Sequence, residues 1–156
     1  MKRSLTHLAF ALFLLSAAAC SSTQPPAAPA LQGNKVISTL KDLASFYQKK
    51  NLPGFMGRID ESFKDRREFE GTVRSVFSKY DTVQFSVQYS KMFITIEDKG
   101  MTRATFNWNS GWESSGGSML KNSGRAIFVF EPKDARLVSI EGKNPFLPQA
   151  IETPKQ

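Results

Sequence analysis

The chain has 156 residues, of which 40% are hydrophobic and 22% charged, an ordinary composition for a single globular domain. Its formal net charge is +7, but the basic residues are dispersed, so no nucleic-acid partner is expected. The single cysteine, Cys20, excludes an intrachain disulfide, and the single histidine, His7, lies in a segment that we expect to be removed. Without further Cys or His, we expect no metal, no cofactor and no Ser-His-Asp or Cys-His catalytic group.

Residues 1–19 follow the three-part pattern of a secretory signal peptide. A short basic start is followed by an apolar run over residues 8–15 and by small residues up to Ala19. Eight apolar residues are too few to cross the ~30 Å hydrocarbon core of a bilayer as a helix. We therefore predict cleavage between Ala19 and Cys20, with no permanent transmembrane helix.

The segment LSAAAC at residues 15–20 resembles the lipobox of bacterial lipoproteins, although Ala17 stands where leucine is favoured. The resemblance implies that Cys20 carries acyl chains, palmitate among them, and anchors the protein to the cell envelope. Two or more acyl chains make such an anchor lasting. Ser21 stands in place of an aspartate that resembles an inner-membrane retention signal, which favours the periplasmic face of the outer membrane in a cell with two membranes. The alternative is simple secretion with a free Cys20.

Residues 20–33 have the composition of a tether. Pro, Ala and Ser dominate the segment SSTQPPAAPALQ, which cannot bury enough apolar surface to fold by itself. We expect a semi-extended tether here, a globular domain over residues 34–148 and a polar tail over residues 149–156.

Three amphipathic helices are predicted between residues 34 and 80. Apolar residues recur at helical spacing over residues 36–47, 52–63 and 69–80. Asn51 is a suitable cap for the second helix. Asp65, with a glutamate three residues later, is similar to a capping box ahead of the third helix.

After residue 80 polar and apolar residues alternate with a period of two, which predicts antiparallel strands. The predicted strands cover residues 83–89, 92–96, 101–108, 126–130 and 137–141. We expect turns at residues 97–100, 109–111 and 132–135, and a flexible loop at the glycine-rich run 114–118. On the fourth predicted strand, Phe128 is expected to face the core and Val129 the outside.

This layout resembles the nuclear-transport-factor-2-like, or SnoaL-like, cone fold: α+β, with three N-terminal helices packed on a curved antiparallel sheet. The resemblance rests on residues 46–55, 73–88 and 124–142, and on an Asn144-Pro145-Phe146 tail similar to that of some secreted members. The alternative is another helix-backed antiparallel sheet of cystatin-like outline. The resemblance implies a pocket between helices and sheet, where isomerases and dehydratases of this fold place an Asp, Tyr or His.

Four residues are candidates for such a pocket. Trp108 and Trp112 could line the mouth of the cone, since tryptophan is enriched where binding occurs. Arg103 could hold an anionic ligand, and Asp60 lies beside the apolar stripe of its predicted helix. Each has a structural alternative: core packing for the tryptophans, an ion-paired or solvated surface for Arg103, and a solvated helix face for Asp60. No catalytic residue of the family can be carried over.

The sequence therefore predicts a membrane-anchored, non-catalytic envelope lipoprotein whose domain binds a small apolar ligand or a protein partner; its oligomeric state is left open. The alternative is a lyase or isomerase that uses a pocket carboxylate. A carboxyl group with a raised pKa beside an open cavity would favour the enzyme. An open pocket lined by Phe, Met and Trp would favour an apolar ligand. A filled core with an exposed apolar patch would favour a protein partner.

Overall fold

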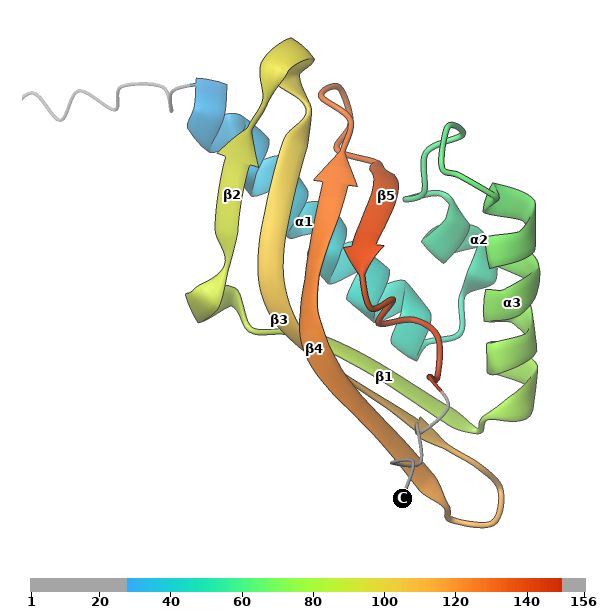
Figure 1. Cartoon of the computed structure of the whole chain (residues 1–156). Coiled ribbons are helices and arrows are strands. Elements are labelled where there is room, and N and C mark those ends of the chain that lie inside the picture. The colour runs from blue at the N-terminus through green and yellow to red at the C-terminus, as the bar shows by residue number, and fades with distance from the viewer. Residues whose placement is uncertain (1–27, 150–156) are drawn as a thin grey trace, which may run out of the picture.

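The computed structural model of the chain describes residues 28–149, which form three α-helices followed by an antiparallel sheet (Figure 1). The signal peptide, Cys20, most of the tether and residues 150–156 of the tail lie outside the described residues. The elements are α1 (Ala28–Gln48), α2 (Leu52–Met56), α3 (Arg66–Lys79), β1 (Thr82–Val87), η1 (Tyr89–Lys91), β2 (Phe93–Ile96), η2 (Asp98–Gly100), β3 (Thr102–Glu113), β4 (Met119–Phe130) and β5 (Leu137–Gly142).

The sheet has the order β1-β3-β4-β5, and β2 pairs with β3 beyond the end of β1. Every pairing is antiparallel. The sheet is strongly curved, and the three helices lie on its inner side (Figure 1). This is the predicted α+β cone, in which one face of the sheet packs on the helices and the other faces solvent. No helix among residues 28–149 is long and apolar enough to span a membrane.

Helix α1 begins at Ala28, six residues before the expected start of the domain. The last part of the expected tether is therefore helical, which the composition did not predict. Alanine is the best helix former, and Pro29 in the first turn has no hydrogen bond to lose, so this composition is compatible with a helix end. Tertiary contact holds the added turns, because the Gln32 side chain donates a hydrogen bond to the hydroxyl of Thr102 at 3.3 Å.

Helix α2 is shorter than its apolar stripe predicted. The expected cap is confirmed, since Asn51 Oδ1 accepts a hydrogen bond from the Gly54 N–H at 3.0 Å. The helix then ends at Met56, with Gly57 as its C-cap residue, instead of continuing to Phe63. The chain beyond it extends along the edge of the sheet, where Ile59 forms a parallel bridge with Leu137. Ile59 is buried in the core all the same, although the helix does not extend to it.

The capping box expected before α3 does not form. Asp65 is the N-cap residue, but its φ of 53° is left-handed and its side chain makes no capping hydrogen bond. A carboxylate caps a helix from an extended backbone, which aims it at the free N–H groups of the first turn. The helix itself is present, and its apolar face is buried as predicted.

The second half of the sheet is longer than predicted. The turn expected at residues 109–111 was wrong, because β3 runs on through these residues and β4 begins at Met119. The turns expected at residues 97–100 and 132–135 and the loop at 114–118 are confirmed. The predicted inner face is confirmed, since Phe128 is fully buried against Phe106, with ring centroids 4.9 Å apart. Val129 pairs with Arg103 on the opposite face and lies outside the core cluster, but it is only 8% exposed.

Candidate functional site

The interior between helices and sheet is filled by a residue from the chain's own C-terminal segment. Phe146 follows β5 and is fully buried. Its ring centroid lies 4.8 Å from those of Phe55 and Phe85, and within 6.4 Å of those of three further aromatic residues, Tyr47, Phe69 and Phe128. These five rings come from α1, α2, α3, β1 and β4, so Phe146 sits where all the layers of the domain meet.

Three buried polar side chains fix this segment in place. The Tyr47 hydroxyl donates to the Phe146 carbonyl at 2.6 Å and accepts from Trp112 Nε1 at 2.7 Å. The Ser110 hydroxyl donates to the Pro145 carbonyl at 2.6 Å. Burial raises the pKa of Tyr47, so the phenol stays protonated and remains a donor. Without these bonds the carbonyl groups of Pro145 and Phe146 would be buried without partners, which would cost about 1–3 kcal/mol each.

The two tryptophans belong to this core and do not line an open mouth. Trp108 and Trp112 are 1% and 0% exposed. They lie four residues apart on one continuous strand, so the period of two places both on its inner face. Trp112 uses its N–H on Tyr47, whereas Trp108 Nε1 has no hydrogen-bond partner among the described residues. Both tryptophans therefore pack in the core, which was the alternative to lining a binding pocket.

Asp60 lies in the loop after α2, at the edge of β5. Its carboxylate accepts hydrogen bonds from the N–H of Ser62 at 3.0 Å and the hydroxyl of Ser62 at 2.7 Å, and faces Arg136 at 3.4 Å. The backbone N–H of Ser62, then its hydroxyl, hold the pKa of Asp60 below its ordinary value. A general acid needs the opposite shift.

Arg103 lies on the outer face of β3. Its guanidinium contacts Glu141 at 2.5 Å and Glu97 at 3.3 Å. The charge is thus paired with carboxylates of β5 and of the segment after β2. The four sequence candidates occupy three separate places: two in the core, one on the outer face and one in a loop. They do not form one site.

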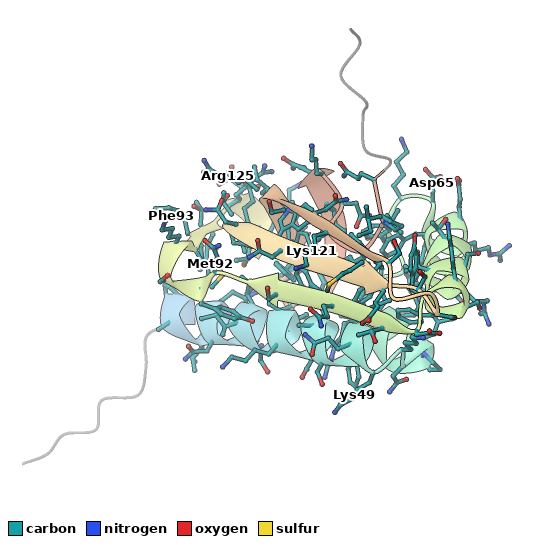
Figure 2. The ribbon with its side chains drawn as sticks, turned by 90° about the horizontal axis from the view of Figure 1, so that it is seen from below. Lys49, Asp65, Met92, Phe93, Lys121 and Arg125 are labelled. Atoms are coloured by element: carbon teal, nitrogen blue, oxygen red, sulfur yellow. The ribbon has the colours of Figure 1, made fainter. Side chains whose placement is uncertain are left out.

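A surface groove that the sequence reasoning missed lies on the outer face of the sheet. It has a volume of about 550 Å³ and crosses β1, β3 and β4. Its lining includes Gln84, Ser86, Asn109, Met119, Lys121 and Ser123. Figure 2 looks onto this side of the molecule, with Lys121 near its middle.

The register of the three strands explains the groove. Gln84 pairs with Gly111, and Gly111 pairs in turn with Lys121, so a glycine stands between two long side chains. A Cβ atom on Gly111 would lie 3.0 Å from the end of the Met119 side chain. The end of the Met119 side chain therefore lies over Gly111 and forms the floor of the groove there. The alternation of Gln84 and Ser86 with apolar neighbours was visible in the sequence, but the pairing that places Gly111 between β1 and β4 was not.

No family model matches the sequence, and no curated protein matches it. Solved structures do match in fold. Aln2 from a Streptomyces species is 14% identical with a TM-score of 0.59, over 74% of this chain and 90% of that chain. A putative aromatic ring hydroxylase from Novosphingobium aromaticivorans is 10% identical with a TM-score of 0.61, over 72% and 87%.

A third match is a nuclear transport factor 2 (NTF2-like) superfamily protein from Salmonella enterica serovar Typhimurium. It is 11% identical with a TM-score of 0.59, over 82% of this chain and 99% of that chain. At such identities the likeness concerns architecture, and one fold serves many activities. The chain has the NTF2-like cone fold.

Proposed function

We propose that this chain is a lipid-anchored, non-catalytic binding protein of the cell envelope, and that its outer groove accepts a segment of a protein partner. The observation that carries the proposal is the filled interior. Phe146 takes the central position of the cone and is bonded there through its backbone. A small apolar ligand in the cone would have to displace this ring, whereas the groove is open as it stands.

The chemistry of the groove suits a peptide. Its amide and hydroxyl side chains, such as Gln84, Asn109 and Ser123, can both donate and accept, as a backbone segment requires. Lys121 adds one positive charge, which favours a partner segment that carries an acid.

The alternative function, a lyase or isomerase that uses a pocket carboxylate, has less support. Asp60 is ion-paired with Arg136 and lies in a loop at the edge of the sheet. Its lowered pKa keeps it ionised at neutral pH, so it is not a proton donor, and also makes it a weaker general base.

The groove can be tested by site-specific photo-crosslinking in cells of the source organism. A photoreactive residue at Ser123, in the groove, should give a discrete adduct, while the same residue at Ser75, exposed on α3, should not. Gly111→Val should remove the adduct, because the new side chain displaces the end of Met119, its nearest neighbour, into the groove. Equal adducts at both serines, or an adduct that survives Gly111→Val, would refute the groove as the binding site.

The anchor is tested separately. Cys20→Ser should abolish metabolic labelling with palmitate and move the protein from the membrane fraction to the soluble fraction. Unchanged labelling in this variant would rule out Cys20 as the acylated residue, without bearing on the groove.

A further inference from the structure

Exposed apolar side chains gather on one side of the molecule, along β2 and the start of α1. Phe93 is 69% exposed, which is unusual for so large an apolar residue. Leu31, Tyr89 and Ile96 are also exposed. Figure 1 shows β2 beside the first turns of α1, and Figure 2 shows Phe93 at the same end of the molecule as the start of that helix. These four residues are called the apolar edge below.

The start of α1 lies close to β2 and β3, and the apolar edge wraps around the edge strand β2: Ile96 pairs with buried Thr102 on the side of α1, whereas Phe93 pairs with Thr105 on the outer face. Gln32 on α1 bonds to Thr102, which pairs with Ile96 of β2. A Cβ atom on Gly33 would lie 4.0 Å from Ile94 of the same strand. The start of the helix and the strand therefore move as one body.

The position of this edge relative to the proposed anchor decides what covers it. Seven residues lie between Cys20 and Ala28, and the eight steps from one to the other span at most about 29 Å when fully extended. Helix α1, with 21 residues, is itself about 31 Å long. A lipid on Cys20 thus keeps the start of α1, and β2 with it, within about one helix length of the bilayer.

We infer that the apolar edge rests in the interfacial region of the bilayer to which the chain is anchored. This inference depends on the proposed lipid anchor. Aromatic residues such as Tyr89 and Phe93 are favoured at the boundary between headgroups and acyl chains. Lys91 and Lys99 stand exposed at the two ends of β2 and can meet lipid phosphates.

Basic residues outnumber the unpaired acidic residue on this side. Glu97 is paired with Arg103 at 3.3 Å, which leaves Asp98 beside the two exposed lysines Lys91 and Lys99. The groove residues lie on the half of β3 and β4 nearer their hairpin, away from β2. The groove therefore lies at the other end of the sheet from β2.

The test uses the full lipidated chain in vesicles that contain an anionic phospholipid. Acylation consumes the sulfur of Cys20, so a thiol introduced by Phe93→Cys is free for labelling with a nitrobenzoxadiazole dye. The control is Ser75→Cys, which places the same dye at an exposed position of α3, on the side of the molecule away from β2 (Figure 1). Neither exposed site is needed for packing, and thermal melts of both variants verify the fold.

Dye at position 93 should shift its emission to the blue on vesicles and lose most of its fluorescence to spin-labelled lipids, while dye at position 75 should do neither. Equal, weak quenching at both positions would overturn the inference and leave the anchor intact. A blue shift at position 93 without lipid quenching would mean that a second copy of the chain covers the β2 edge, which also overturns it. A chain that fails to float with the vesicles would refute the anchor itself.

Discussion

Phe146→Ala should destabilise the domain severely. Truncating a fully buried Phe to Ala costs about 3–5 kcal/mol, and here the ring contacts five aromatic side chains from five elements. The described domain has about 120 residues, for which the entropy of unfolding is about 0.25 kcal/mol per kelvin. A loss of about 4 kcal/mol therefore lowers the melting temperature by about 15 °C. The loss of about 4 kcal/mol is a large share of the ~5–15 kcal/mol free energy of unfolding of such a domain.

The assay is a thermal melt, followed by circular dichroism, of the chain without residues 1–20, so that no lipid contributes. Phe93→Ala is the matched control: the same truncation at a position 69% exposed should change the melting temperature by about 2 °C or less. Toluene should raise the melting temperature of Phe146→Ala, because an apolar cavity of this kind binds an aromatic ring, and should leave the unchanged chain unaffected. A Phe146→Ala variant that melts within about 3 °C of the unchanged chain would refute the filled interior.

Three further predictions concern separate parts of the fold. Trp112→Phe should cost about 1–2 kcal/mol more than Trp108→Phe in chemical denaturation, because only Trp112 donates a hydrogen bond. A chain that begins at Asn34 should melt below one that begins at Ala28, since it lacks the first turns of α1 and their bond to the sheet. Asp60→Asn should lower stability at pH 7, and the difference should vanish as the pH falls through the pKa of Asp60. Because that pKa is lower in the folded state than its ordinary value, the ionised form is the stabilising one; urea unfolding of both chains from pH 7 to pH 2 checks the sign.

Local periodicity was enough to predict the class of the fold. The alternation around Phe128 gave the correct inner face of β4, and the stripes over residues 36–47 and 69–80 are the buried faces of α1 and α3. Where the prediction failed, the deciding contact was distant in the sequence. Apolar character at helical spacing favours a helix at Ile59, but the burial of this residue comes from pairing with Leu137 on another element.

The candidate site was harder to predict because it depends on strand register. Asn109-Ser110-Gly111 has turn composition and so predicts a turn between Trp108 and Trp112, although the spacing of four also suits one face of a strand. The groove needs Gly111 between Gln84 and Lys121, and only the pairing of β1 with β3 and of β3 with β4 brings these together. In the sequence Phe146 is only part of a tail motif, because no local pattern marks an isolated residue as central to the core.

The bond between Tyr47 and Phe146 joins residues 99 positions apart in the chain. Closing so long a loop is entropically costly, and contacts of this separation form late and slow the folding of small domains. Until residue 146 has left the ribosome, the helices and the first strands lack the ring that completes their packing. The core is therefore completed last by the C-terminal segment, when nearly the whole domain is available for packing.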